Sequence, residues 1–314
     1  MVGAEKAAAA RSLADVRVLA VVGPTASGKS ALAMQLAERL SIELVSCDSL
    51  MVYAGMDVGT GKPTAAERAA VPHHLLDVVS PAEPFHAARW AALARAAIEG
   101  IVARGRTPVI VGGTGLYLRA LVGGLFEAPP PDPAIRERHR TEAAQGGVEA
   151  LHARLRTVDP ETAARVLPRD LMRISRALEV YEQTGQPISV LRRQAEPASG
   201  LRASTVVLDP PLEELRGRID RRFDAMMNGG LLDETRALRD AFGTAARPLQ
   251  ALGYRQLGDF LDGRCPLEEA ITAAKSATAA YARRQRTFFR KQAPPTWRCP
   301  TLPTADAVLD WWRE

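Results

Sequence analysis

The sequence predicts an α/β fold, in which a parallel sheet core carries an inserted helical domain and is completed by C-terminal helices. The first observation is a β-branched, apolar run at 16–22 that leads through a glycine-rich loop into helical spacing at 31–40. The second is the alternation of buried runs with helical patterns up to residue 120, and the third is a change at residue 121 to charged helical segments broken by prolines. Alternating strands and helices are typical of a parallel sheet covered on both faces.

Each predicted element rests on its own pattern. The predicted strands are short apolar runs at 16–22, 42–45, 108–111 and 206–208. The predicted helices of the core have apolar residues at helical spacing or are rich in alanine, and lie at 31–40, 85–104, 212–227, 231–242 and 267–291. The last three follow the insertion, so we expect the later part of the chain to rejoin the core as helices.

The chain is long enough for a full hydrophobic core, with 314 residues of which 46% are hydrophobic. We expect a flexible N-terminal tail at 1–15, a core formed by 16–120 together with 205–314, and a helical insertion at 121–204. No stretch approaches the roughly 20 apolar residues that cross a bilayer. The three cysteines are far apart and have no histidine at metal spacing, so the sequence indicates neither a disulfide framework nor a zinc site. We expect a cytoplasmic monomer.

The positive charge is concentrated near the C-terminal end. The net charge is +5, and no acidic residue lies between Glu269 and Asp306. Seven basic side chains fall in this interval, interleaved with aromatic ones: Lys275, Arg283, Arg284, Arg286, Arg290, Lys291 and Arg298. This pattern favours a polyanion with stackable bases, because phosphates attract arginine and lysine while rings stack on bases. The alternative is a solvated helix face.

The loop after the first strand carries the strongest motif. It matches the phosphate-binding pattern G-x-x-x-x-G-K-[ST], with a strand before it and a helix after it. Its predicted diphosphate-binding residues are Gly23, Pro24, Thr25, Ala26, Ser27, Gly28, Lys29 and Ser30. Backbone N–H groups would surround the phosphate oxygens, Lys29 would add a charge and the Ser30 hydroxyl could hold Mg²⁺. The motif predicts a diphosphate or triphosphate ligand without selecting ATP.

Asp48 follows the second predicted strand, at the end of the sheet where ligands of parallel sheets bind. Such a carboxylate could ligate Mg²⁺ or act as a general base. It could also cap the next turn. Its position in the sequence does not separate these three roles.

A series of motifs resembles the tRNA dimethylallyltransferase (isopentenyl transferase) family, in its order from residue 23 to about 290. The matching segments are GPTASGKS (23–30), CDSLMVY (47–53), GMDVGTGKP (55–63), PHHLLD (72–77), VGGTGLY (111–117), RIDRRFDAM (218–226), GYRQ (253–256) and RRQRTFFR (283–290). Eukaryotic members often append a zinc finger, which this sequence does not show, so we expect the bacterial type.

The resemblance implies a P-loop NTPase or kinase-like core with a helical insertion that contacts tRNA. It implies transfer of a dimethylallyl group from dimethylallyl diphosphate to N6 of the adenosine 3′-adjacent to the anticodon, in tRNAs that read codons starting with U. Pyrophosphate would leave, with Mg²⁺ as cofactor, and the phosphate loop would hold the donor. The residues implied to bind the tRNA anticodon loop are Asp48, Ser49, Leu50, Met51, Thr114, Arg173, Arg176, Arg255, Arg283, Arg284, Gln285 and Arg290.

Two positions depart from the family pattern. Met51 stands where many members have glutamine in D-S-x-Q-x-Y. Met172 replaces the glutamine of N-D-P-Q-R, for which the resemblance implies an RNA contact. Any hydrogen bond that the family makes through these two amides is therefore not transferred to this chain.

The implied chemistry suggests catalytic roles for Asp48, Thr25 and Arg222. An adenine amine must lose a proton as the N–C bond forms, so we expect Asp48 to be the base. Departing pyrophosphate requires cations, which Lys29, Mg²⁺ at Ser30 and Arg222 could supply. Arg222 adjoins the apolar stripe of its predicted helix, although it could instead be a surface arginine. Thr25 could position the amine or a phosphate oxygen, or bond its own backbone.

Arg173 and Arg176 lie in the first turns of a helix capped by Asp170, where the helix dipole disfavours cations. This placement suggests RNA contact, and the alternative is pairing of Arg176 with Glu179 or Glu182. For the whole chain, the rival functions are a small-molecule or nucleotide kinase that uses ATP, and an RNA-binding NTPase without transfer chemistry.

Overall fold

The computed structural model describes residues 16–124, 129–194, 201–291 and 296–314. The predicted tail at 1–15 lies outside the described residues. The chain divides into two compact units, one comprising Met1–Val122 with Ser199–Glu314 and the other Gly123–Ala198. The smaller unit falls inside the interval 121–204.

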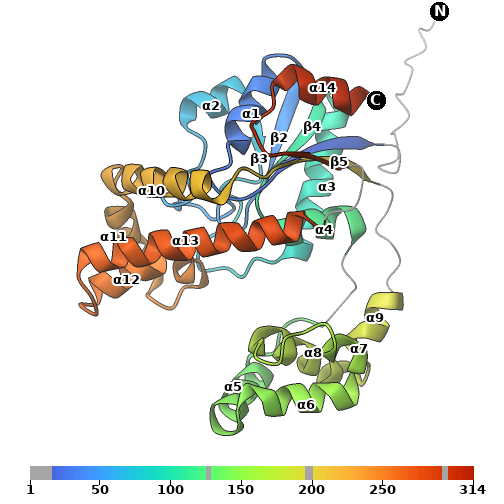
Figure 1. The fold of residues 1–314 in the computed structure, drawn as a ribbon, viewed down its shortest axis with the longest axis vertical. Helices are drawn as coiled ribbons and strands as arrows, with labels where there is room; N and C mark the ends of the chain where they lie inside the picture. The colour runs from blue at the N-terminus through green and yellow to red at the C-terminus, as the bar shows by residue number, and fades with distance from the viewer. Residues whose placement is uncertain (1–15, 125–128, 195–200, 292–295) are drawn as a thin grey trace, which may run out of the picture. The chain divides into compact units, whose positions relative to one another are not determined.

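A six-stranded parallel sheet forms the centre of the larger unit (Figure 1). In chain order its strands are β1 (Arg17–Val22), β2 (Ile42–Cys47), β3 (His73–His74), β4 (Thr107–Gly112), β5 (Arg202–Leu208) and β6 (Thr296–Cys299). Their order across the sheet is β3-β2-β4-β1-β5-β6, and the pairs register as Leu19 with Val109 and with Ser204 on the two sides of β1. The predicted α/β class with a parallel sheet is confirmed.

Two of the strands were not predicted because neither contains an apolar run: β3 is His-His and β6 is Thr-Trp-Arg-Cys. β3 has two residues and β6 has four. β6 pairs with β5, so the C-terminal part of the chain contributes a strand to the sheet as well as helices.

Helices cover the sheet on both faces. In the larger unit they are α1 (Lys29–Ala37), α2 (Ala65–Ala70), α3 (Ala87–Ala103), α4 (Gly115–Gly123), α10 (Leu212–Asn228), α11 (Leu231–Phe242), α12 (Tyr254–Leu261), α13 (Leu267–Phe289) and α14 (Ala305–Arg313), with a 3₁₀ turn at Arg247–Gln250. α1 begins two residues earlier than its predicted start at residue 31, directly after the glycine of the phosphate loop.

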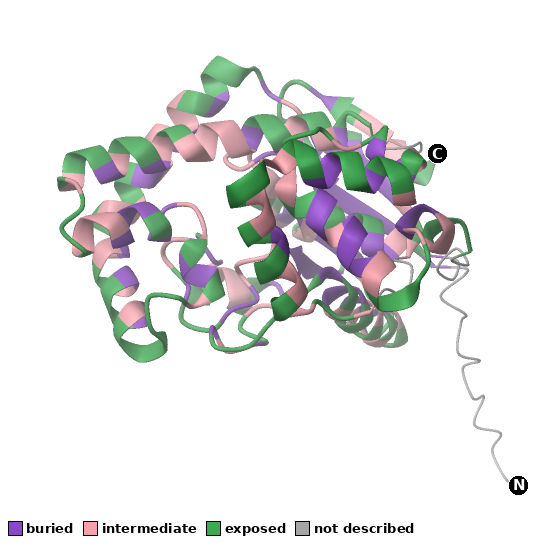
Figure 2. Cartoon of the chain, turned by 90° about the horizontal axis from the view of Figure 1, so that it is seen from below, coloured by how far each residue is buried: buried purple, intermediate pink, exposed green. Residues whose placement is uncertain are grey.

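Alternate side chains of β1 point to opposite faces of the sheet, as the two-residue period of a strand requires. Leu19 and Val21 pack with α1 and α14, whereas Val18, Ala20 and Val22 pack with α3, α4 and residues of the later helices. The buried residues are purple in Figure 2, and they line the strands and the inward faces of the helices. Helices therefore pack on both faces of the sheet, and this packing supports the loops at the carboxyl ends of its strands.

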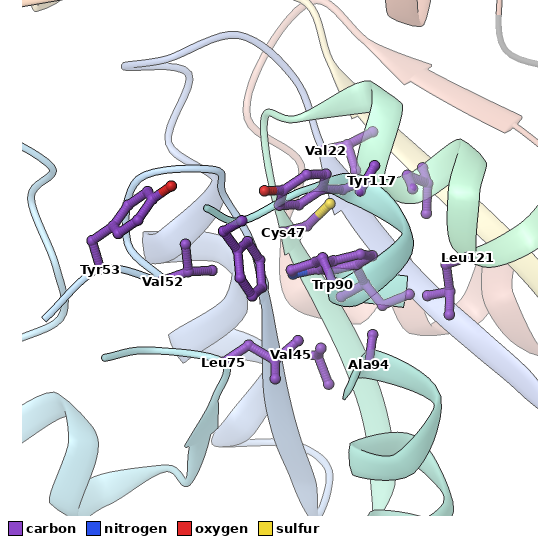
Figure 3. Close-up of a cluster of buried hydrophobic side chains, with 14 of the residues drawn as sticks. Val22, Val45, Cys47, Val52, Tyr53, Leu75, Trp90, Ala94, Tyr117 and Leu121 are labelled. Atoms are coloured by element: carbon purple, nitrogen blue, oxygen red, sulfur yellow. The ribbon is translucent and has the colours of Figure 1, made fainter. Parts of the chain in front are cut away.

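Below the end of β2 lies an aromatic cluster, part of which Figure 3 shows. The rings of Trp90 on α3 and Tyr117 on α4 stack with centroids 4.9 Å apart. The Trp90 indole N–H donates to the carbonyl oxygen of Ser46 at 3.0 Å. Since both Trp90 and the Ser46 carbonyl are buried, this bond holds the carboxyl end of β2 against α3.

The smaller unit has a helical core of its own. Its helices are α5 (Pro133–Gly146), α6 (Val148–Val158), α7 (Pro160–Ala163), α8 (Leu171–Thr184) and α9 (Ile188–Gln194). Leu151, Leu155, Ile174 and Leu178 are among the buried residues that these helices share. Over the described part of the chain, no helix has the length and apolar character that a membrane span requires.

Candidate active site

The loop between β1 and α1 has the backbone shape of an anion site. Gly23 has φ 150°, and a side chain there would collide with the carbonyl oxygen of Leu208 on β5. Gly28 has φ 95° and caps α1, so Lys29 is the first residue of the helix. Glycine adopts such conformations without a steric penalty. N–H groups at the start of a helix attract phosphate oxygens, and the helix dipole adds to this attraction.

Lys29 is half-buried in this loop. Its ammonium group donates to the carbonyl oxygen of Pro24 at 2.5 Å. Burial and the nearby Arg222 guanidinium lower the pKa of Lys29 to about 7, and the Asp48 carboxylate only partly opposes this shift. Two cations are therefore held close together in the protein without ligand, and a bound diphosphate would relieve their repulsion.

Gln285 on α13 fastens the phosphate loop to the end of β4. Its Oε1 accepts a hydrogen bond from the Thr25 N–H at 2.9 Å, and its Nε2 donates to the Gly113 carbonyl oxygen at 2.9 Å. The side chain is buried. Both ends of this amide are thus engaged within the protein, although the resemblance implies a tRNA contact for Gln285.

Asp48 follows β2 and begins a tight turn. Its Oδ1 accepts hydrogen bonds from the N–H groups of Leu50 at 2.8 Å and Met51 at 3.3 Å. The Thr114 hydroxyl accepts from the Ser49 N–H at 3.1 Å, which fixes the same turn from the side of α4. The capping role is therefore present. Because both bonds use Oδ1, the second carboxylate oxygen is not committed to the turn.

Two adjacent glycines bring the phosphate loop and Asp48 together. β4 lies between β1 and β2, so the two loops are not on neighbouring strands. A side chain at Gly112 would collide with the carbonyl oxygen of Cys47, and one at Gly113 would collide with Gln285. The absence of both side chains lets β2, β4 and α13 converge.

Arg222 extends from α10 into the same space. Its Nη2 donates to the carbonyl oxygen of Thr60 at 3.0 Å, and a side chain at Gly61 would collide with this guanidinium. Burial lowers the pKa of Arg222, while the Asp48 carboxylate favours its charge. The apolar stripe of α10, with buried Leu215, Ile219 and Phe223, fixes the helix face beside it.

These groups line one cavity of about 430 Å³. Its polar wall includes Thr25, Lys29, Ser30, Asp48, Arg222 and Gln285. Its apolar wall includes Leu50, Met51, Ile219, Phe223, Met226 and Leu231. Tyr281 of α13 also lines the cavity, and burial together with the Asp48 carboxylate raises its pKa to about 12. The cavity can hold an anion at one side and an apolar group at the other.

Two protein-family models match this chain. The model of the family described as IPP transferase matches residues 51–292, and a second model, described as isopentenyl transferase, matches residues 16–78. The chain belongs to the IPP transferase family. The predicted family is thereby confirmed, and the kinase alternative is not supported.

Individual members of the IPP transferase family match over nearly the whole chain. The tRNA dimethylallyltransferase of Anaeromyxobacter dehalogenans (strain 2CP-C) is 51% identical over 285 residues, which cover 91% of this chain and 95% of that protein. That of Geobacillus kaustophilus (strain HTA426) is 45% identical over 282 residues, which cover 90% of each. Both relatives are bacterial, as expected.

Solved structures of the family agree with the fold. The full-length tRNA isopentenylpyrophosphate transferase of Bacillus halodurans has a TM-score of 0.66 and 37% identity, covering 95% of this chain and 94% of that one. A eukaryotic dimethylallyltransferase, described as acting on tRNA, has a TM-score of 0.69 and 28% identity, covering 86% of this chain and 68% of that one.

The predicted RNA-binding residues of the family's basic segment lie along α13 and after it. Arg283 and Arg284 are exposed, and the Arg284 guanidinium lies 5.6 Å from the Tyr281 ring centroid. Arg290 pairs with Asp209 at 3.2 Å, and Arg286 pairs with the same carboxylate. Arg255 is exposed on α12. The exposed members of this set are available to a polyanion.

In the smaller unit, the two predicted arginines differ. Arg176 pairs with the fully buried Glu179 at 2.6 Å and donates to the Pro129 carbonyl oxygen at 2.8 Å. The alternative of pairing with Glu179 is thus what the structure shows. Burial would raise the pKa of Glu179, but Arg176 and Arg136 hold it below the ordinary value. Arg173 is 70% exposed and pairs only loosely with Asp170 at 3.4 Å.

Two charged groups beside the cavity were not found from the sequence. Lys62, with 1% of its side chain exposed, donates to Asp57 at 2.7 Å, to Asp77 at 2.5 Å and to the Tyr53 carbonyl oxygen at 2.6 Å. Lys62, Asp57 and Asp77 lie inside the family motifs GMDVGTGKP and PHHLLD, so these motifs could have indicated the three residues. Glu234 accepts hydrogen bonds from three successive backbone N–H groups at 57–59. It lies outside those motifs.

Proposed function

We propose that the protein transfers a dimethylallyl group from dimethylallyl diphosphate to N6 of the adenosine 3′-adjacent to the anticodon, in tRNAs that read codons starting with U. The observation that carries the proposal is the cavity itself, which is lined by Lys29, Arg222 and Asp48 together with apolar residues of the turn at 48–51 and of α10. Membership of the IPP transferase family, whose relatives are described as tRNA dimethylallyltransferases, supports the same activity.

In the proposed reaction, the adenine N6 attacks C1 of the dimethylallyl group, the C–O bond to the diphosphate breaks, and pyrophosphate leaves. The loop N–H groups, Lys29 and Arg222 stabilise the negative charge that develops on the leaving group. The uncommitted oxygen of Asp48 accepts the N6 proton, for which positioned base catalysis typically contributes about 10²- to 10⁴-fold. Thr25 lines the cavity on the phosphate side.

Magnesium suits the donor set of this cavity. The Ser30 hydroxyl lies in the first turn of α1 and lines the cavity together with Asp48. Oxygen ligands are those that Mg²⁺ prefers, and it usually takes few of them from protein and the rest from phosphates and water. We propose that Ser30 holds the ion, which when bound neutralises charge on the diphosphate.

The tRNA contact follows from the location of Asp48. Asp48 lines a cavity, which a base that stays stacked in an RNA loop cannot enter, so the target adenosine must be extruded from the anticodon loop. We propose that the exposed arginines of α13 contact the RNA backbone and that the turn at 48–51 contacts the extruded base. A tRNA substrate implies action in the cytoplasm, and we propose that the monomer is the active form, which sedimentation of the active protein would test.

One assay tests the activity. The protein is incubated with undermodified tRNA, Mg²⁺ and either dimethylallyl diphosphate or ATP, and the digested tRNA is analysed by mass spectrometry. We expect prenylated adenosine in the reaction with dimethylallyl diphosphate and not in the reaction with ATP. Turnover of ATP without a modified base would refute the proposal and support a kinase or NTPase.

A further inference from the structure

A carboxylate on α11 is bonded to a loop that contacts the phosphate side of the cavity. Glu234 lies in the first turn of α11. Its Oε2 accepts from the N–H groups of Asp57 at 2.8 Å and Val58 at 2.7 Å, and its Oε1 accepts from Gly59 at 3.0 Å. Three successive N–H groups directed at one carboxylate form an anion-binding concavity of the main chain.

Tyr254 on α12 completes this arrangement. Its hydroxyl donates to Glu234 Oε1 at 2.7 Å, and a side chain at Gly59 would collide with its phenol group. Burial and the Glu234 carboxylate raise the pKa of Tyr254, so the phenol remains a donor. Hydrogen bonds to a charged acceptor are stronger than neutral ones. The loop at 57–59 is therefore fixed to α11 and α12.

The next residue of the loop contacts the proposed catalytic arginine. The Thr60 carbonyl oxygen accepts from Arg222 Nη2 at 3.0 Å, and the bare backbone of Gly61 makes room for the guanidinium. Lys29 lies near enough to repel Arg222. A fixed acceptor is needed to keep Arg222 over the phosphate loop before an anion arrives, because like charges would otherwise separate toward solvent.

We propose that Glu234 is a positioning residue that holds Arg222 over the phosphate loop through the backbone of residues 57–60. This inference rests on the proposed function for the part that Arg222 plays there. The Glu234 carboxylate does not line the cavity, and it acts by fixing the Thr60 carbonyl oxygen. Preorganised cations lower the cost of binding and of charge development on the diphosphate.

Binding of inorganic pyrophosphate tests the proposal without requiring the prenyl transfer. Titration calorimetry with Mg²⁺ is carried out on the wild type, Glu234→Gln, Arg222→Ala and the double variant. Glutamine keeps the size of the side chain, but it loses the charge and turns one N–H donor toward the loop. We expect Glu234→Gln to weaken pyrophosphate binding about tenfold, or about 1.4 kcal/mol. In the Arg222→Ala background we expect no further change beyond about twofold, since the two residues act as one unit.

A residue with a purely structural role gives a different result. Equal weakening by Glu234→Gln in both backgrounds, or no weakening in the wild-type background, would overturn the proposal. The matched control is Asp233→Asn, whose exposed carboxylate pairs with Arg236 on the neighbouring turn of α11. Pyrophosphate binding by this variant should stay within about twofold of the wild type, since surface ion pairs contribute little.

If Glu234→Gln does not fold by circular dichroism, Tyr254→Phe takes its place. It removes only the phenolic donor, so we expect about threefold weaker pyrophosphate binding in the wild-type background. In the Arg222→Ala background we expect no further weakening. The same binding constant in Tyr254→Phe and wild type would then count against the proposal. Failure of the wild type to prenylate tRNA would refute the proposed function alone, because pyrophosphate binding still reports on Glu234.

Discussion

The side-chain amide of Gln285 accepts a hydrogen bond from the N–H of Thr25 at 2.9 Å, across 260 positions of the sequence. The same amide donates to the carbonyl oxygen of Gly113. The helix that carries the exposed arginines is thus bonded directly to the loop that would hold the donor. A movement of α13 on RNA binding would therefore change the position of Thr25 in the phosphate loop.

Gln285→Leu should weaken the phosphate site and the fold together. It leaves the half-buried Thr25 N–H and the buried Gly113 carbonyl without their partner, and an unsatisfied buried group costs about 1–3 kcal/mol. We expect a lower free energy of unfolding in urea and about tenfold weaker pyrophosphate binding. Thr287→Ala, on an exposed position of the same helix, is the control. Unchanged pyrophosphate binding in Gln285→Leu would show that the amide does not shape the loop.

Substitutions of Asp48 separate its two roles. Asp48→Asn keeps the oxygen that caps the turn, whereas Asp48→Ala removes it. If Asp48 is the base, both variants should lower kcat by about 10²- to 10⁴-fold with little change in tRNA affinity. Single-turnover transfer and tRNA binding would measure the two effects. A kcat for Asp48→Asn within about threefold of the wild type would assign Asp48 to the turn alone.

Donor binding should weaken as the pH rises above neutral. The pKa of Lys29 is lowered to about 7 in the free protein, and a bound diphosphate raises it again. Above pH 7 the free lysine is neutral, so the donor binds with uptake of a proton and its Kd rises with pH by up to about tenfold per unit. Calorimetry between about pH 7.5 and 9.5, where the diphosphate is already ionised, measures the slope. Lys29→Met should bind weakly with a flat profile; a slope unchanged by this substitution would assign the proton to another group.

The two arginines of the smaller unit should behave in opposite ways. Arg176→Ala removes a partner from the buried Glu179 and should lower the stability by about 1–3 kcal/mol. Arg173→Ala, at an exposed position, should leave the Tm within about 1 °C and reduce tRNA affinity if Arg173 contacts a phosphate. Thermal unfolding and filter binding at fixed salt give both quantities. An Arg173→Ala variant with unchanged tRNA affinity would remove that residue from the interface.

Much of the fold could be predicted because its signals are local. The apolar runs before Gly23 and Asp48 and the glycine pattern of the phosphate loop are contiguous in the sequence, so the parallel sheet and the loop between β1 and α1 could be predicted from them. The series of family motifs predicted the family to which the chain belongs. β6 was missed because Thr-Trp-Arg-Cys at 296–299 is not an apolar run, and its pairing depends on β5, nearly a hundred residues earlier.

The contacts of Glu234 and Gln285 could not be predicted, because they join segments that are far apart in the sequence. Glu234 resembles an ordinary acidic residue in the first turn of a helix, and only the folded chain brings the N–H groups of 57–59 to it. Gln285 lies in a basic segment that suggests RNA, yet its side chain is turned into the protein. The pairing of Arg176 with Glu179 within α8 was one of the expected alternatives, whereas the burial of Glu179 and its second partner, Arg136 on α5, depend on packing between helices.

Gly112 and Gly113 have a consequence for the precision of the site. With no side chain at either position, main-chain atoms of β2 and β4 meet directly, and Gln285 seals the contact. Side chains change rotamer and repack, but a separation fixed by touching backbones has no such freedom. The separation between Asp48 and the loop at 23–30 is therefore set by main-chain contacts of the sheet, and substitutions in the surrounding cavity wall could alter which substrate enters without changing that separation.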